Sequence, residues 1–383
     1  MKIAVYISPA HGVPPREEDI LAPWELVSDL ADGLVDRGHQ VNLYAAKESQ
    51  TKANLRHFEI STTYEQKNRL PREHYKKLVY DREFELFEKM MNEVKTEGIG
   101  IVHVHHPVER LAYFVQKYPD INFLFTLHDP ISAERAPKLA QLAGSGNCFF
   151  ISISNSQRGQ YQLPFAATVY NGIHLEEYPF SGESADYNLI AGRIIPDKGD
   201  AEAIEAVRRS SGKLIIAGKV YQDSPGDYDY FKNKIQPNID NEHVFLESEI
   251  NKSKLIAYYS QARSYLFPVK WEEPFGLVMI EAMSVGCPII AYARGAVPEI
   301  VKDGITGFII NQNAENIRGD WQIKQSGVEG LSEAINRIKS MGAEDYMNMR
   351  KQCRQHVFEK FTFERMISGY EEIYRQFYKE EMK

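Results

Sequence analysis

The sequence of 383 residues has little cysteine, no long apolar run and no excess of basic residues. Its three cysteines, Cys148, Cys287 and Cys353, are far apart and form no CxxC pair, which argues against a zinc site, a redox pair or a disulfide framework. No segment approaches the roughly 18 consecutive apolar residues of a membrane span. The apolar stretch Ile3–Ile7 is also too short for a signal peptide. We therefore expect a soluble, cytoplasmic protein.

The charge balance excludes another class of function. Lys and Arg number 45 against 53 Asp and Glu, so the formal net charge is -8. General binding of nucleic acid requires a basic surface that releases counterions, and we expect no nucleic-acid partner. A hydrophobic content of 43% is typical of a folded protein, and the length suits two domains. A local basic pocket for a small phosphorylated molecule remains compatible with this charge.

Strand and helix signals alternate through the first half of the chain. The strands are apolar on both faces, which is typical of a parallel sheet covered by helices on both sides. The β-branched and apolar runs predict strands at 3–7, 41–45, 101–104, 123–127 and 149–153, and the helical periodicity predicts helices at 24–37 and 79–97.

The alternation lapses into turn-forming sequence at 172–186 and then restarts. The second half predicts strands at 188–191, 213–217, 243–246, 264–267 and 288–291, helices near 200–210, 227–236, 252–262 and 277–285, and a last helix at 362–379. The pattern predicts an α/β protein with two doubly wound parallel sheets, one in residues 1–171 and one in residues 187–361, joined by a linker at 172–186. Open sheets of this kind bind ligands beyond the carboxyl ends of their strands.

The strongest motif is the string Trp271–Met283, directly after the strand that ends at Phe267. Gly276 opens a helix, so the amides at its start are unpaired donors that suit an anion or a sugar hydroxyl. Glu273 in the preceding loop and Glu281 inside the helix could then bind two parts of one nucleotide sugar. An acidic helix start that merely complements the helix dipole is the alternative interpretation.

A second motif, Gly192–Gly199, also follows a strand and opens a helix. Its Arg193 and Lys198 could neutralise a diphosphate that departs with two negative charges. A solvated turn would be the ordinary reading of these residues in isolation. The chain has neither GxGxxG nor GxxxxGKS, so no dinucleotide or NTPase loop competes with this reading.

Histidines form a third group. His103, His105 and His106 follow one strand, and His128 follows another. A zinc site is the tempting interpretation of the first three, but no matching Cys or acidic ligands stand out, and ordinary polar residues at a strand end are favoured. A neutral His128 could donate to a sugar hydroxyl or stabilise charge on a glycosyl group.

Together these motifs resemble the nucleotide-sugar signatures of the family 4 retaining glycosyltransferases. The matching strings occur in the expected order along almost the whole chain. They are Arg37–His39, Asn171–Ile173, Gly192–Gly199, Glu273–Glu281, Gly295–Val301 and Asp303–Phe308. The resemblance implies the GT-B fold, in which two Rossmann-like domains face each other across a cleft and the last helix, here 362–383, crosses back to the first domain.

The resemblance also implies roles for individual residues. Residues 1–171 would bind the acceptor and residues 187–361 the donor. Arg193 and Lys198 would hold the donor diphosphate and stabilise its departure, and Glu281 would bind the ribose. Glu273 and the backbone of residues 275–278 would hold the hexose, and His128 would lie near the transferred sugar. The backbone residues in question are Phe275, Gly276, Leu277 and Val278, and Gly12 would approach the phosphate or the acceptor.

The implied reaction moves a hexose from a nucleoside diphosphate sugar to an acceptor hydroxyl with retention of configuration. The family needs no metal and no resident cofactor, and the absence of a DxD triplet near a strand end agrees with this. The acceptor is open, and could be a saccharide, a small molecule or a lipid-linked group. One departure concerns the acceptor side, because the segment Ile20–Glu25 lacks the Gly-Gly pair of most relatives.

Other functions stay open on the same fold. The rivals are a nucleotide-sugar epimerase, a phosphorylase with pyridoxal phosphate on a lysine, and a non-catalytic subunit that binds nucleotide sugars. A basic stretch at 67–82 could also give weak contact with a membrane surface. A solvated helix flank is the favoured interpretation of that stretch.

Overall fold

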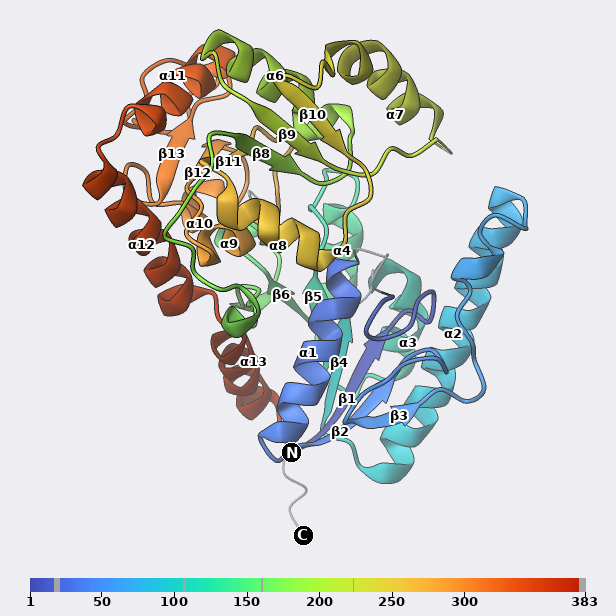
Figure 1. Ribbon diagram of the computed structural model, residues 1–383. Helices are drawn as coiled ribbons and strands as arrows, with labels where there is room; N and C mark the ends of the chain where they lie inside the picture. Colours follow the sequence, from blue (N-terminus) through green and yellow to red (C-terminus); the bar gives the residue numbers. More distant parts are fainter. Residues whose placement is uncertain (17–20, 106–107, 160, 223, 379–383) are drawn as a thin grey trace. The chain divides into compact units, whose positions relative to one another are not determined.

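The computed structural model describes residues 1–16, 21–105, 108–159, 161–222 and 224–378 (Figure 1). The chain divides into two compact units. Unit 1 contains Met1–Asn171 together with the C-terminal residues from Glu364, and unit 2 contains Gly172–Phe363. The expected linker 172–186 therefore falls within unit 2. Most of the expected crossing helix falls in unit 1, and its residues 379–383 lie outside the described part of the chain.

Unit 1 is built on a seven-stranded parallel sheet in the order β3-β2-β1-β4-β5-β6-β7. The central strands are buried along their whole length, because helices cover both faces (Figure 1). The strands are β1 (Lys2–Ile7), β2 (Gln40–Tyr44), β3 (Asn54–Arg56), β4 (Ile101–His105), β5 (Phe123–Leu127), β6 (Cys148–Ser152) and β7 (Phe165–Thr168). The helices are α1 (Ala22–Asp36), α2 (Arg72–Glu97), α3 (Ala112–Lys117), α4 (Ala136–Ala143), α5 (Asn155–Arg158) and α13 (Phe363–Phe377).

Unit 2 has a six-stranded parallel sheet in the order β10-β9-β8-β11-β12-β13. Its strands are β8 (Asn188–Ala191), β9 (Leu214–Ala217), β10 (Val244–Glu247), β11 (Ser264–Phe267), β12 (Ile289–Tyr292) and β13 (Gly307–Ile310). Its helices are α6 (Asp200–Arg209), α7 (Pro225–Tyr230), α8 (Lys252–Gln261), α9 (Leu277–Ser284), α10 (Val297–Ile300), α11 (Gly327–Lys339) and α12 (Ala343–Lys360). The prediction of two doubly wound parallel sheets is confirmed.

Several elements were not predicted. Strand β3 has only three residues, and β7 is only partly buried along its length. Strand β13 is fully buried and has four residues, as do the predicted strands β8 to β12, so its length does not explain why it was missed. Helix α12 has no clear apolar pattern in the sequence, because its buried face includes the charged residue Arg350, which is fully buried. Its guanidinium donates to the carbonyl oxygens of Ser181 and Ser260 at 3.0 Å each, so the charge is satisfied inside the unit.

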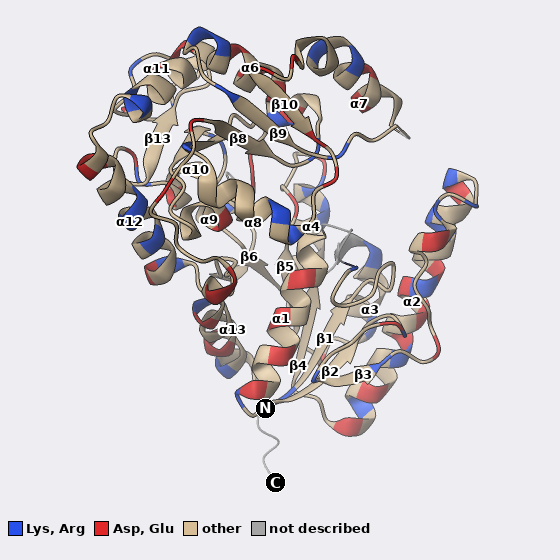
Figure 2. Cartoon of the chain, viewed as in Figure 1, with Lys and Arg blue, Asp and Glu red and all other residues tan. Residues whose placement is uncertain are grey.

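Helix α2 begins at Arg72, seven residues before the predicted start at 79. Its first turns carry charge of both signs and little apolar surface, as the alternating colours in Figure 2 show. Pairs three or four residues apart stabilise this exposed segment: Lys76 with Glu73 at 2.8 Å, and Lys77 with Asp81 at 2.6 Å. Lys76 and Lys77 of the basic stretch are thus each paired with an acid on their own helix.

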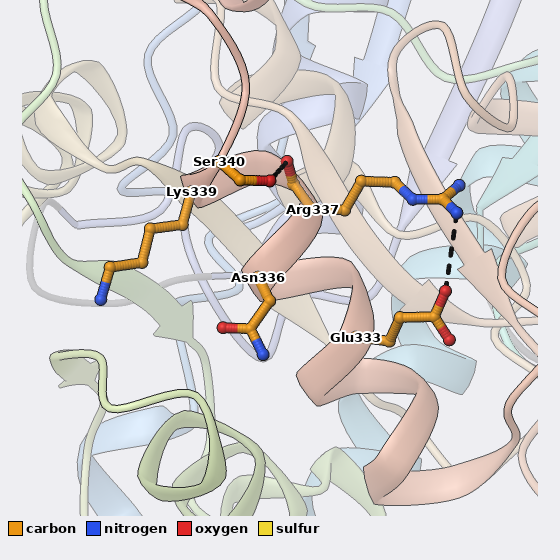
Figure 3. Close-up of a pocket in the computed structure, with 5 residues that line it drawn as sticks. All are labelled: Glu333, Asn336, Arg337, Lys339 and Ser340. Carbon is orange, nitrogen blue, oxygen red and sulfur yellow. Dashed lines mark hydrogen bonds and ion pairs between the residues drawn. The ribbon is translucent and has the colours of Figure 1, made fainter.

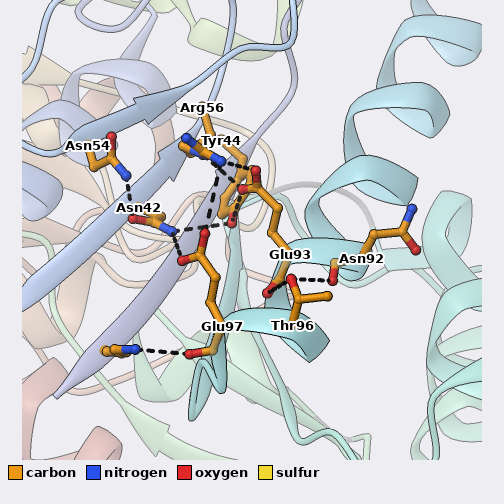
Figure 4. Close-up of polar contacts among 9 residues, drawn as sticks. Asn42, Tyr44, Asn54, Arg56, Asn92, Glu93, Thr96 and Glu97 are labelled. Atoms are coloured by element: carbon orange, nitrogen blue, oxygen red, sulfur yellow. Dashed lines mark hydrogen bonds and ion pairs between the residues drawn. The ribbon is translucent and has the colours of Figure 1, made fainter.

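Polar contacts fasten α2 to the edge of the sheet in unit 1 (Figure 4). Glu93 accepts hydrogen bonds from Arg56 Nε at 2.8 Å and from the Tyr44 hydroxyl at 3.0 Å. One turn later, Glu97 accepts from Asn42 Nδ2 at 3.2 Å. These contacts join strands β2 and β3 to the helix that covers them.

Helix α13 is held to unit 1 by charge and by burial. Glu371 pairs with Arg37 and with His39, each at 2.8 Å. On its inner face Tyr370 and Tyr374 are buried against the sheet. Among the described residues, no helix combines the length and the apolar character needed to cross a membrane.

Candidate functional site

Two of the predicted motifs lie at the point where the strand order of unit 2 reverses. Strands β8 and β11 are neighbours there, and the chain proceeds outward from them in opposite directions. The loop at 192–199 follows β8, and the loop at 268–276 follows β11. In open α/β sheets this switch point, beyond the carboxyl ends of the strands, is where ligands bind.

Glycines bring the backbones of these loops into contact. Gly199 has φ +82°, and a Cβ atom there would lie 2.2 Å from the carbonyl oxygen of Pro268. Gly295 has φ +55°, and its Cβ atom would lie 2.1 Å from the carbonyl oxygen of Glu273. Only glycine fits such close approaches. The loops at 192–199, 268–276 and 293–296 therefore form one cluster.

Lys198 and Glu273 meet in this cluster. Lys198 Nζ lies 3.2 Å from Glu273 Oε2, and the same oxygen accepts a hydrogen bond of 2.9 Å from Trp271 Nε1. The Lys198 and Glu273 side chains are only 19% and 11% exposed. The ammonium also lies 4.9 Å from the centre of the Trp271 ring, within cation–π range. Trp271 thus contacts both charged groups. The sequence motif contains Trp271 but did not predict this role.

Arg193, at the start of the same loop, is exposed, and no ion pair or hydrogen bond of its side chain to another described residue is found. Its guanidinium is therefore available to an anion that reaches the strand ends. Helix α9 begins at Leu277 after Gly276, as predicted, and its first amides lack intrahelical acceptors. Glu281 lies inside α9, where its Oε2 accepts a hydrogen bond of 3.2 Å from the Tyr259 hydroxyl.

A buried carboxyl beside Lys198 was not singled out by the sequence. Asp200 opens α6, is 3% exposed, and its Oδ2 has no hydrogen-bond partner among the described residues. Burial raises its pKa from 3.8 to about 7. The neighbouring Glu202 is instead paired with Lys270 at 2.8 Å. For Asp200 the effect of burial exceeds the opposing effect of the Lys198 and Lys270 charges.

A second carboxylate group anchors the loop at 293–296. Glu272 accepts a hydrogen bond of 2.8 Å from the Gly295 amide and pairs with Arg318 at 2.7 Å and Arg294 at 3.1 Å. The adjacent Glu272 and Glu273 therefore differ in role: the first binds a neighbouring loop, and the second faces Lys198. Nothing in the dipeptide itself distinguishes them, because Arg318 lies 46 positions after Glu272 and Lys198 lies 75 positions before Glu273.

In unit 1, His128 lies just beyond β5 and is partly exposed. Its Nε2 is 3.0 Å from Nδ1 of His105 on the neighbouring strand β4. Burial is the main cause that lowers the pKa of His128 to about 4, so the imidazole is neutral at pH 7. Gly12 follows β1, and a Cβ atom there would meet only ordinary contacts of 3.6 Å or more. The structure does not bring Gly12 and His128 into hydrogen-bond contact.

The strand-end histidines form a buried cluster. His103 is fully buried and His105 nearly so, and desolvation lowers the pKa of both, that of His103 to about 3. His106 lies outside the described residues. Among the residues that are described, no group of three or more His, Cys, Asp or Glu side chains is placed to hold a metal ion.

A surface hollow is lined by residues of α11 and by the residue that follows it: Glu333, Asn336, Arg337, Lys339 and Ser340 (Figure 3). Its lining is charged and exposed, with an ion pair of 3.6 Å between Arg337 and Glu333. None of the predicted site residues lines it. The hollow therefore has no part in the candidate site.

Comparison with known proteins agrees with the motifs. Residues 25–177 match the family described as Glycosyltransferase Family 4, and residues 179–356 match Glycosyl transferases group 1. The N-acetyl-alpha-D-glucosaminyl L-malate synthase of Bacillus anthracis is 24% identical over 381 residues, which cover 91% of this chain and 92% of that protein.

Solved structures show the same fold. The sucrose-phosphate synthase of Thermosynechococcus elongatus has a TM-score of 0.74 at 19% identity, with 98% of each chain covered. The Anabaena protein HepE in complex with UDP-glucose has a TM-score of 0.67 at 16% identity, with 98% of this chain and 100% of that chain covered. The chain belongs to the family 4, group 1 glycosyltransferases of the GT-B fold.

Proposed function

We propose that this glycosyltransferase moves a hexosyl group from a nucleoside diphosphate sugar to an acceptor hydroxyl, with retention of configuration and without a metal ion. The observation that carries the proposal is the pairing of Lys198 with Glu273 at the strand ends of unit 2, beside the exposed Arg193. The positively charged side chains at this switch point suit the phosphates of such a donor. The fixed carboxylate beside them suits its sugar hydroxyls.

Arg193 and Lys198 would act on the leaving group. Cleavage of the anomeric C–O bond places additional negative charge on the departing diphosphate, so cations near it stabilise the transition state more than the ground state. Trp271 and Glu273 hold the Lys198 ammonium in place before the donor arrives. Little reorganisation is then needed as the charge develops.

Glu273 would bind the sugar. Its Oε2 receives both Lys198 and Trp271, while its Oε1 has no partner among the described residues. That oxygen remains available to a hexose hydroxyl. Glu281 would accept from the ribose, and the amides of Phe275, Gly276, Leu277 and Val278 would supply donors at the start of α9.

The retaining course is taken from the resemblance to the retaining glycosyltransferases, and no residue of this chain is assigned as a covalent nucleophile. In the proposed reaction the acceptor hydroxyl attacks from the face that the diphosphate leaves, and a phosphate oxygen takes its proton. Unit 1 would bind the acceptor. Gly12 would lie near the phosphate or the acceptor, and His128 would lie near the transferred sugar. A saccharide, a small molecule and a lipid-linked group all remain candidate acceptors.

The ligands and names of similar proteins suggest which base and which sugar of the donor to test first. HepE was solved with UDP-glucose, and the Bacillus anthracis enzyme is named for an N-acetylglucosaminyl group. UDP-glucose and UDP-N-acetylglucosamine are therefore the first donors to test, with the GDP and ADP sugars as comparisons. The true donor should raise the Tm most, since a ligand stabilises the state that binds it.

The test of the function is release of nucleoside diphosphate that depends on both donor and acceptor. Each donor is incubated with the protein and a panel of acceptors, and the anomeric configuration of the product is read by proton NMR. Retained configuration in a new glycoside supports the proposal. An interconverted nucleotide sugar would show an epimerase, and binding without turnover over the whole panel would favour a non-catalytic subunit.

A further inference from the structure

A chain of hydrogen bonds runs through the buried part of unit 1, from α13 to His128. The Tyr374 hydroxyl lies 2.7 Å from His103 Nδ1, and the same nitrogen lies 3.3 Å from His105 Nε2. His105 Nδ1 is then 3.0 Å from His128 Nε2. The two ring nitrogens of His105 are thus both engaged, and the chain ends at the partly exposed imidazole of His128.

The three imidazoles are neutral at pH 7, because burial lowers the pKa of each. A neutral imidazole carries one N–H and one bare nitrogen. Each contact in the chain needs one donor and one acceptor, so the tautomer of one ring dictates that of the next. All three rings must carry the proton on Nε2, or all three must carry it on Nδ1.

The direction depends on the phenol at the start of the chain. If Tyr374 donates to His103 Nδ1, then His103 donates from Nε2 to Thr126 Oγ1, which lies at 2.8 Å. His105 Nε2–H then shares the single lone pair of the bare His103 Nδ1 with the Tyr374 hydroxyl, at the longer distance of 3.3 Å. His128 Nε2–H faces the bare His105 Nδ1. The reverse direction requires the phenol oxygen of Tyr374 to accept.

Two general chemical preferences favour donation by Tyr374. In either direction, one hydroxyl hydrogen among Thr126, Tyr370 and Tyr374 has no acceptor among the described residues. The number of unpaired hydroxyl hydrogens therefore does not distinguish the two directions. The distances do not decide either, because the contacts of His103 with the Tyr374 hydroxyl at 2.7 Å and with Thr126 Oγ1 at 2.8 Å are both typical of an O–H donor. A phenol, however, is a better donor than acceptor, and an isolated neutral imidazole favours the Nε2–H form.

We propose that Tyr374, through His103 and His105, holds His128 in the Nε2–H tautomer, so that His128 presents a bare Nδ1. Tyr374, His103 and His105 are positioning residues, since they would act on the sugar only through His128. If the proposed function holds, the bare Nδ1 accepts a hydrogen bond from a sugar hydroxyl, which reverses the donor role expected from the sequence. This use of His128 rests on the proposed function, whereas the tautomer itself does not.

The test reads the tautomers directly in the protein without ligand. Long-range proton–nitrogen NMR of 15N-histidine-labelled protein at pH 7 separates bare from protonated ring nitrogens, and histidine variants assign the signals. We expect the Nε2–H pattern for His103, His105 and His128. The Nδ1–H pattern, or a mixture of tautomers in any of the three rings, would overturn the proposal.

A matched pair of variants tests the role of the phenol. Tyr374→Phe removes the hydroxyl that faces His103, and we expect the ring nitrogens of His103, His105 and His128 to shift toward mixed tautomers. Tyr370→Phe removes a hydroxyl on the same helix that lies 3.2 Å from Thr126 Oγ1 and does not contact the three rings by hydrogen bonds. This control should retain the wild-type pattern. Equal spectra for Tyr374→Phe and wild type would refute the relay.

Turnover separates the two proposals. Once a donor is known, Tyr374→Phe should lower kcat about tenfold, the worth of one hydrogen bond, with little change in KM for the donor. Tyr370→Phe should lower it much less. Wild-type protein with the Nε2–H pattern but no transferase activity would overturn the proposed function alone. Active protein with the opposite tautomer would overturn the relay alone.

Discussion

Unit 2 presents charged side chains at its strand ends, whereas unit 1 buries its polar side chains beneath a helix. In unit 2, Lys198 and Glu273 come from loops whose backbones approach closely at glycines. Arg193, in the same loop as Lys198, is exposed. In unit 1, His103 and Tyr374 are separated by 271 positions and meet in the interior. The same fold thus supports an electrostatic site in one unit and a hydrogen-bonded relay in the other.

The contrast follows from the two kinds of ligand expected. A diphosphate requires positive charge that can be reached from solvent, so the donor side cannot bury its cations without a large desolvation cost. A neutral sugar hydroxyl requires one well-aimed acceptor or donor, and buried partners keep its direction fixed. If the proposed function holds, each unit has the arrangement that suits the ligand proposed for it.

The largest expected effect is on the donor side. Lys198→Ala removes the cation beside the leaving group and should lower turnover by about two orders of magnitude or more. Lys270→Ala is the matched control, because Lys270 is also half-buried and paired, with Glu202 at 2.8 Å. It should change turnover within about threefold. Near-normal activity of Lys198→Ala would remove the role from this residue.

Next in size is the effect on the glycine contacts that assemble the donor loops. Gly295→Ala places a Cβ atom 2.1 Å from the carbonyl oxygen of Glu273 at a φ of +55°, and should destabilise the fold by roughly 2–4 kcal/mol. Gly226→Ala is the control, since its Cβ would meet nothing within 4 Å. Urea denaturation measures both. A Gly295→Ala variant as stable as wild type would show that the loops need no close approach.

The buried Asp200 predicts a stability effect that depends on pH. Its pKa is raised to about 7 in the folded state, so the folded protein keeps a proton that the unfolded chain loses near pH 4. This contribution is complete below about pH 4 and is lost as the pH rises to about 7. Asp200→Asn should therefore stabilise the protein at pH 8, by roughly 2–4 kcal/mol, and have little effect at pH 4.

Thermal denaturation of Asp200→Asn at both pH values measures this effect. Asp197→Asn, in the same loop but exposed, is the control and should have no such dependence on pH. A stability gain of Asp200→Asn that is equal at pH 4 and pH 8 would contradict the assignment of the buried acid.

The smallest expected effect is on the basic stretch of α2 in unit 1. Lys76, Lys77 and Arg82 are each paired with an acid on the same helix. Replacing all three by Gln should change the Tm by about 1 °C or less. It should also leave sedimentation with anionic liposomes nearly unchanged. Strong sedimentation of the wild type that the variant loses would assign this surface to membrane contact.

The sequence predicted one unit better than the other for a physical reason. The donor motifs are local strings, since Gly192–Gly199 and Trp271–Met283 each follow a strand and open a helix, and backbone geometry forces their residue types. The histidine relay joins β4, β5 and α13, and no local pattern relates Tyr374 to His128. Strand β3 was missed because it has only three residues, and α12 was missed because the charged Arg350 lies within its buried face.

Hydrogen exchange with and without the nucleotide sugar tests the central claim most directly, namely that the donor binds at the switch point of unit 2. UDP-glucose and UDP-N-acetylglucosamine are the probes, with the GDP and ADP sugars for comparison. We expect the donor that raises the Tm most to slow exchange at 192–199 and 268–281. Protection confined to unit 1, with none in these two segments, would show that the donor does not bind at this switch point.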